Sequence, residues 1–124
     1  MVSRRNVPGK GEIWHTNGNP VSGREFKGAD YYLVISEFAL NQKLGTALCV
    51  PITSGGGPAR SEAITVYLDG SSTDAGKITG IALCYQIRSL DLNERKATYA
   101  AQAEPDIVDE ILAKVIDILD PQLN

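Results

Sequence analysis

Short apolar or alternating stretches, separated by polar turns, follow one another along most of the chain. Signals such as Asn17-Gly18-Asn19-Pro20 and Asp69-Gly70 mark the turns, and the stretches between them have the length of strands. The pattern predicts strands over residues 12–16, 31–36, 46–53, 63–68, 78–85 with an extension toward Arg88, and 96–100, and short helical turns over 37–44 and 90–94. Short strands at near-regular spacing favour a small β-barrel or a curled antiparallel sheet.

The last part of the chain has a helical pattern. Pro105 suits the first position of a helix, and Asp106 favours the positive end of the helix dipole. Apolar residues recur at helical spacing at Val108, Ile111, Leu112, Val115, Ile118 and Leu119. We therefore expect a helix over 105–120 whose apolar face packs on the core or on a second subunit.

With 124 residues the chain can form one core but not two, so we expect a single domain over 1–124 with a polar leader over 1–10. Its 43% hydrophobic and 22% charged residues are ordinary for a globular protein. No apolar stretch approaches the roughly 20 residues of a membrane span, and residues 1–10 lack the apolar centre of a secretion signal. We expect a cytoplasmic protein with no membrane partner.

Cys49 and Cys84 both lie in apolar, strand-like stretches. Buried free thiols fit such positions better than a disulfide does, because nothing places the chain in an oxidising compartment. The two cysteines and the single histidine, His15, do not form a ligand set with zinc-site spacing. We therefore expect no metal and no cofactor.

The net charge of −3 is divided unevenly along the chain. From Glu104 onward six acidic residues face one lysine, whereas the rest of the chain has eleven basic residues against nine acidic ones. This mildly basic body cannot hold long nucleic acid by charge alone, but it does not oppose a short single strand in a local groove.

The stretch from Thr53 to Arg60 carries the most chemistry. The hydroxyls of Thr53 and Ser54 end a predicted strand, and Gly55 and Gly56 then leave the backbone amides accessible. Arg60 adds a fixed charge that can bind a phosphate through two nitrogens. These groups suit an anionic ligand, although the same residues also form an ordinary hairpin loop.

Four other blocks accompany this loop in a defined order: Gly11-Glu12-Ile13-Trp14, Asn19-Pro20-Val21-Ser22-Gly23-Arg24-Glu25, Leu33-Val34-Ile35-Ser36 and Gln86-Ile87-Arg88-Ser89-Leu90-Asp91. In this order and spacing the chain resembles the MazF/PemK family of toxin endoribonucleases, especially its PemK (Kid) and ChpB branch. That branch reads GEIW, DP-x-x-G-x-E, VLVIS, P-[IV]-TSGG-x-x-AR and Q-x-R-x-[IL]-D. The resemblance covers about residues 11–119.

The resemblance implies a mainly β fold with a C-terminal helix, an SH3-like small β-barrel of the MazF/CcdB type, and a homodimer. It also implies the toxin of a type II toxin–antitoxin pair, which cleaves single-stranded RNA without metal and so blocks translation. The expected partner is an antitoxin whose acidic tail crosses the loops 24–27 and 54–60.

The resemblance also implies roles for individual residues. Thr53 and Ser54 match the hydroxyls at the scissile phosphate, and Glu25 matches the acid of the G-x-E motif. The expected substrate-binding residues are Ser54, Gly55, Gly56, Arg60, Lys27, Gln86 and Arg88.

Other positions depart from the family pattern. Asp30 and Tyr31 replace an arginine and a proline, and Arg24 replaces a serine or histidine. Leu83 and Tyr85 replace the arginine and aspartate that act as acid and base in the PemK branch.

Three interpretations of these departures stay open. In the first, Arg24 supplies the missing positive charge and Glu25 or Tyr85 takes part in proton transfer, with Thr53 at the phosphate. In the second, an arrangement that includes His15 cleaves RNA. In the third, the protein binds a partner without cleaving RNA. That partner would be a gyrase-type target, as for CcdB, or an antitoxin or operator DNA in a degenerate, regulatory member.

Overall fold

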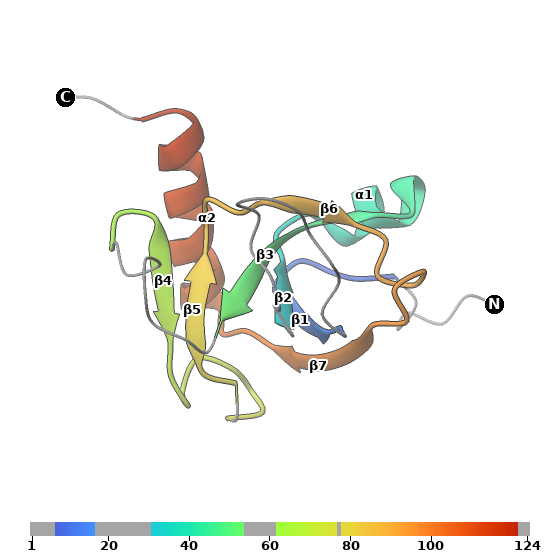
Figure 1. Cartoon of the computed structure of the whole chain (residues 1–124), viewed down its shortest axis with the longest axis horizontal. Coiled ribbons are helices and arrows are strands. Elements are labelled where there is room, and N and C mark those ends of the chain that lie inside the picture. Colours follow the sequence, from blue (N-terminus) through green and yellow to red (C-terminus); the bar gives the residue numbers. More distant parts are fainter. Residues whose placement is uncertain (1–6, 17–30, 54–61, 77, 122–124) are drawn as a thin grey trace.

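The computed structural model describes residues 7–16, 31–53, 62–76 and 78–121. The fold is a curved antiparallel sheet with two helices (Figure 1). The long helix lies against one face of the sheet, and the short helix lies at the end of the molecule away from the long helix. The elements are β1 (Glu12–His15), β2 (Tyr31–Val34), α1 (Phe38–Leu44), β3 (Ala47–Thr53), β4 (Thr65–Leu68), β5 (Gly80–Leu83), β6 (Arg88–Leu90), β7 (Thr98–Gln102) and α2 (Pro105–Leu119).

The seven strands form one sheet in the order β4-β5-β3-β2-β1-β7, and β6 pairs with β3 beside β5. Each strand pairing is antiparallel. Within the described part of the chain the order ends at β4 and β7, so the sheet is curved like a barrel but is not closed by a pairing of these two strands. The predicted mainly β fold with a C-terminal helix is confirmed.

The sheet buries side chains on both of its faces. One face packs Leu33, Val50 and Ile52 against Ile111 and Val115 of α2. On the opposite face Trp14, Tyr32, Val34, Ala47 and Cys49 pack with Leu90 and Leu92, which belong to β6 and the turn after it. The alternation of side chains along β3 therefore supplies both clusters, as the period of a strand requires.

The prediction of a continuous strand from 78 to 85 toward Arg88 is wrong. Strand β5 ends at Leu83, and β6 begins at Arg88. Ile52 pairs with Ala82, and Cys49 pairs with Arg88. These positions are three residues apart along β3 but six residues apart along the chain from β5 to β6. The extra residues form a turn that the uninterrupted apolar pattern did not reveal.

The predicted boundaries after this turn also shift. Leu90, predicted to begin a helical turn, belongs to β6, and the turn follows it, with the Arg95 amide bonded to the Asp91 carbonyl at 3.1 Å. Lys96 then adopts a left-handed backbone with φ 56°, which ends the turn. The last strand consequently begins at Thr98 rather than at Lys96.

The C-terminal helix is confirmed over Pro105–Leu119, with Pro105 in its first turn. Val108, Ile111 and Val115 are buried as predicted, but Leu119 is 70% exposed and lies off the core. No helix among the described residues is long and apolar enough to cross a membrane. Cys49 and Cys84 are buried free thiols, as predicted.

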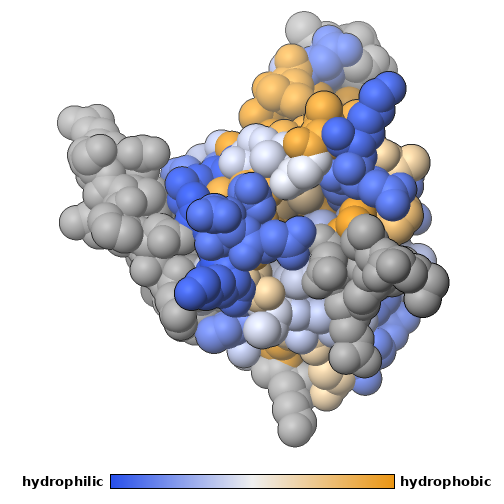
Figure 2. Space-filling model, turned by 90° about the vertical axis from the view of Figure 1, so that its right-hand side faces the viewer, coloured by the Kyte–Doolittle hydropathy of each residue, from blue (hydrophilic) through white to orange (hydrophobic). Residues whose placement is uncertain are grey.

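Large apolar side chains are also exposed at the opposite end of the molecule. Leu40 and Leu44 on α1 and Leu48 at the start of β3 are 46%, 61% and 42% exposed. Figure 2 looks at this end and shows apolar atoms gathered toward the top, apart from a hydrophilic region below them. These exposed leucines are available for contact with another protein.

Glu12 joins the N-terminal segment to the first strand. Its carboxylate is buried and accepts hydrogen bonds from the Gly9 amide at 2.8 Å and from the Trp14 indole nitrogen at 3.1 Å. The glutamate and the tryptophan of the Gly11-Glu12-Ile13-Trp14 block therefore hold each other in place. This block is part of the structure that supports the sheet.

Glu12→Ala should lower the free energy of unfolding by about 1–3 kcal/mol, because two buried N–H groups lose their acceptor. Glu37→Ala is the matched control, since Glu37 forms an ion pair with Lys10 at 2.8 Å but its side chain is 70% exposed. The control should cost no more than about 1 kcal/mol. Urea unfolding measures both, and equal losses would contradict the role given to Glu12.

Candidate functional site

Thr53 is the last residue of β3 and lies directly opposite Ile81 of β5. The backbone of Gly80 approaches it so closely that a β-carbon at Gly80 would collide with the Thr53 carbonyl oxygen. Gly80 also has φ 146°, a conformation that side chains disfavour. The glycine thus allows two strands to meet tightly at the position where the predicted phosphate-binding hydroxyl stands.

The turn between β5 and β6 carries two further predicted residues. Tyr85 is 37% exposed and Gln86 is half-buried. The Gln86 amide donates to the Leu83 carbonyl at 3.0 Å, and the Cys84 amide donates to the Ile64 carbonyl at 3.1 Å. Ile81 is the residue opposite Thr53, and Tyr85 follows it by four residues. At the rise of a strand, the α-carbon of Tyr85 is therefore at most about 13 Å from the α-carbon of Ile81.

Leu83 stands where the PemK branch has its arginine. Its side chain is 1% exposed. A charged side chain in this place would be withdrawn from water, which is costly unless it is paired. This chain therefore has a buried apolar side chain where the PemK branch has a cation.

Arg88 lies on the same face of the sheet as Thr53. It pairs with Cys49 in the register of β3 and β6, and Cys49 and Thr53 are four residues apart on one strand. Its Nη1 donates to the Tyr32 hydroxyl at 3.4 Å. The structure thus orients Arg88 across the face opposite α2, with Tyr32 as its support.

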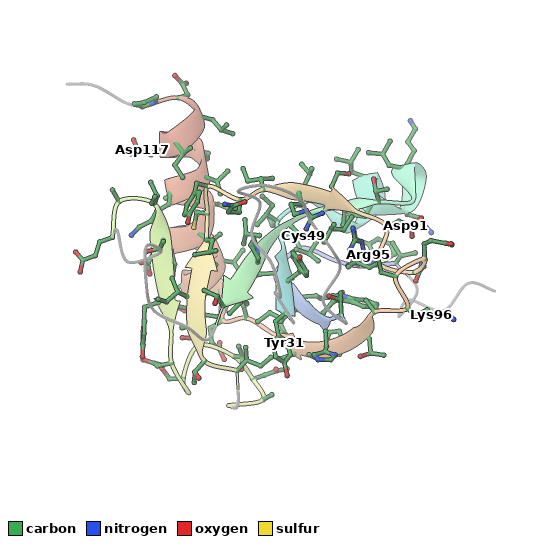
Figure 3. The ribbon with its side chains drawn as sticks, in the orientation of Figure 1. Tyr31, Cys49, Asp91, Arg95, Lys96 and Asp117 are labelled. Atoms are coloured by element: carbon green, nitrogen blue, oxygen red, sulfur yellow. The ribbon has the colours of Figure 1, made fainter. Side chains whose placement is uncertain are left out.

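Arg95 is a cation that the sequence reasoning did not single out. Its Nη1 is buried and has no hydrogen-bond partner among the described residues. Figure 3 shows Arg95 beside Cys49, with Asp91 at the turn nearby and Asp117 far away on α2. Burial raises the pKa of the Cys49 thiol to about 12, and the charge of Arg95 opposes this rise. Asp91 and Arg95 are four positions apart, the spacing of neighbours on one helical turn. This spacing is the feature of the sequence that could have pointed to Arg95.

His15 and Tyr31 lie side by side on paired strands, with ring centroids 5.0 Å apart in an edge-to-face contact. His15 is therefore involved in packing at the end of β1. The other predicted residues lie outside the described residues: Arg24, Glu25, Lys27, Ser54, Gly55, Gly56 and Arg60. Within the described ranges, no group of three or more His, Cys, Asp or Glu side chains could hold a metal ion.

Comparison with known proteins assigns the chain to a protein family. Residues 9–119 match the model of the PemK-like, MazF-like toxin of type II toxin-antitoxin systems. The chain belongs to this family. It is 31% identical to the endoribonuclease PemK of Escherichia coli over 119 residues, which cover 96% of this chain and 87% of the relative. It is 36% identical to the endoribonuclease toxin ChpB of Escherichia coli K12, over 86% of this chain and 89% of the relative.

Solved structures agree with the sequence relatives. The MazF structure from Deinococcus radiodurans superimposes with a TM-score of 0.78 at 29% identity, and the match covers 91% of this chain and 96% of that one. MazF in a MazE–MazF complex from the same organism gives a TM-score of 0.75 at 28% identity, over 94% of this chain and 99% of that chain. The predicted family and its fold are thus confirmed.

The two thiols should not react in the folded protein at pH 8. Burial raises the pKa of Cys49 to about 12 and that of Cys84 to about 11, so both stay protonated. Ellman's reagent should label both only after unfolding in urea. Labelling of the folded protein at the unfolded rate would contradict this.

The same pKa shifts predict a pH dependence of stability. Between pH 9.0, the ordinary thiol pKa, and the raised value in the folded state, the unfolded chain releases protons that the folded chain keeps. Stability therefore falls as the pH rises through this window. Cys49→Ala should show a shallower fall than the wild type in urea unfolding between pH 9 and pH 11.

Proposed function

We propose that this chain is the toxin of a type II toxin–antitoxin system and an endoribonuclease that cleaves single-stranded RNA and inhibits translation. The observation that carries this proposal is the family match over residues 9–119, which spans the strands that hold Thr53 and the turn that holds Tyr85. The relatives with this match are named endoribonucleases.

The proposed reaction is attack of a ribose 2′-hydroxyl on the adjacent phosphate. The 2′-oxygen–phosphorus bond forms, the bond from phosphorus to the 5′-oxygen breaks, and the products are a cyclic phosphate and a free 5′-hydroxyl. A base takes the 2′-hydroxyl proton and an acid protonates the leaving oxygen, while donors stabilise the charge on the phosphorane.

We assign these roles as follows. Thr53 and Ser54 contact the phosphate, Glu25 or Tyr85 transfers protons, and Arg24 stabilises the developing charge. Substrate is held by Gly55, Gly56, Arg60, Lys27, Gln86 and Arg88. The position of Arg88 on the Thr53 face supports its assignment, because a cation there can contact the same strand of RNA.

The proposed partners are a second copy of the chain and a cognate antitoxin, and the proposed compartment is the cytoplasm. Solved relatives in complexes named MazE–MazF support the antitoxin. The exposed leucines of α1 and β3 and the exposed Leu119 of α2 are apolar surface that a symmetric dimer could cover. The alternative, a member that binds without cleaving, is not favoured by relatives that are named endoribonucleases.

Cleavage should persist in EDTA, because the proposed reaction needs only acid–base groups and hydrogen-bond donors. The purified protein is incubated with a long single-stranded RNA, with and without chelator, and the products are analysed for a cyclic phosphate end. Cleavage that stops in EDTA and returns with added metal would overturn the metal-independent mechanism. No cleavage in either buffer would favour the binding alternative.

Arg24→Ala should reduce the rate of cleavage by roughly two to three orders of magnitude, the usual cost of losing a group that stabilises a charged intermediate. Lys43→Ala, which removes an exposed lysine at the end of α1, is the control and should cleave normally. Arg60→Ala tests the competing source of charge. If Arg24→Ala cleaves normally and Arg60→Ala is inactive, the charge comes from the glycine-rich loop.

A further inference from the structure

Lys114 is the one basic residue of α2, and its ammonium group contacts the backbone of a different part of the chain. The Nζ atom donates to the carbonyl oxygen of Glu62 and, at 2.9 Å, to that of Thr65. The Glu110 carboxylate lies 4.0 Å from the same nitrogen and is half exposed, so this ion pair contributes little. Lys114 therefore acts mainly as a donor to two carbonyls.

The segment that Lys114 holds is bonded on its other side to the turn after β5. The Ile64 carbonyl accepts from the Cys84 amide at 3.1 Å, and Thr65 pairs with Leu83 in the register of β4 and β5. Cys84 directly precedes Tyr85. Hydrogen bonds thus join α2 to residues 62 and 65, and a further hydrogen bond joins residue 64 to the turn that presents Tyr85. The backbone of residues 62–65 connects these bonds.

Apolar packing does little to fix residues 62–64, whereas Thr65 is buried at the start of β4. Glu62 and Ala63 are exposed and Ile64 is only half-buried. An open cleft lies beside the segment and is lined by Lys114, Glu110, Glu62, Thr65, Tyr67 and Ile81. A lysine has three donors on a long stem, so it can bridge such a cleft to two carbonyls at once.

We infer that Lys114 is a positioning residue for RNA cleavage: from α2 it fixes residues 62–65 and, through them, the turn that carries Tyr85. This inference rests on the proposed function and takes Tyr85, one of its two candidates, as the residue that transfers protons. The charge of Lys114 also reaches the turn, since it lowers the pKa of the Cys84 thiol against the larger rise caused by burial. Lys114 therefore interacts with the turn through its charge as well as through the hydrogen-bonded segment.

Lys114→Met keeps most of the stem and removes the donors. It should lower kcat by about ten- to a hundredfold, the range expected when a reacting group loses its placement, with a smaller change in KM. Lys114→Arg should restore most of kcat, because a guanidinium can donate to both carbonyls. Lys43→Met, at the opposite end of the molecule on α1, is the control and should leave kcat unchanged (Figure 1).

A double-mutant cycle with Tyr85→Phe separates positioning from general stability. If Lys114 acts through Tyr85, Lys114→Met should reduce kcat less than about twofold further in the Tyr85→Phe background. An equal fold-loss in both backgrounds, or a wild-type kcat in Lys114→Met, would overturn the inference. Rates are measured well below the melting temperature of each variant.

Amide hydrogen exchange tests the path without RNA. Lys114→Met should raise the exchange rate of the Cys84 amide about tenfold or more, while Lys114→Arg should leave it near the wild-type rate. Unchanged exchange in Lys114→Met would overturn the positioning role. A wild type that cleaves no RNA, combined with faster exchange in Lys114→Met, would overturn the proposed function and still support the link between α2 and the turn.

Discussion

The pairing of β3 is the constraint on which the rest of the structure depends. Along one edge β3 pairs with β2, and along the other it pairs with β5 at its end and with β6 at its start. Its side chains contribute to the core beneath α2 on one face and to the cluster around Trp14 on the other. A one-residue shift of its register would exchange these two sets and would move Thr53 to the wrong face.

This constraint explains why the chain has a break between β5 and β6. Two strands share one edge of β3, and the six steps along the chain from Ala82 to Arg88 face only three steps of β3, from Ile52 to Cys49. The excess must leave the plane of the sheet as a turn. Tyr85 is exposed on that turn, whereas Leu83 and Cys84 before it are buried.

The sequence predicted those parts of the fold that local patterns determine. The helix over Pro105–Leu119 and the strand that ends at Thr53 follow from periodicity and from the residues at their ends. The break after Leu83 has no glycine or proline and could not be seen, because its cause is a register between strands far apart in the sequence. The resemblance to the family located Thr53, Gln86 and Arg88, but not the support of Arg88 by Tyr32 or the partly buried charge of Arg95.

The two ends of the candidate site are held by different kinds of interaction. Thr53 lies in the ladder of β3 and β5, in close backbone contact with Gly80. The turn that carries Tyr85 is held by hydrogen bonds of the Gln86 amide to Leu83 and of the Cys84 amide to Ile64, and Lys114 at an open cleft contacts the residues on either side of Ile64. Hydrogen bonds to exposed segments open more readily than packed strands do, so the Tyr85 end is the adjustable one. In the proposed function this difference would let Thr53 hold a phosphate firmly while the Tyr85 end adjusts to the RNA strand.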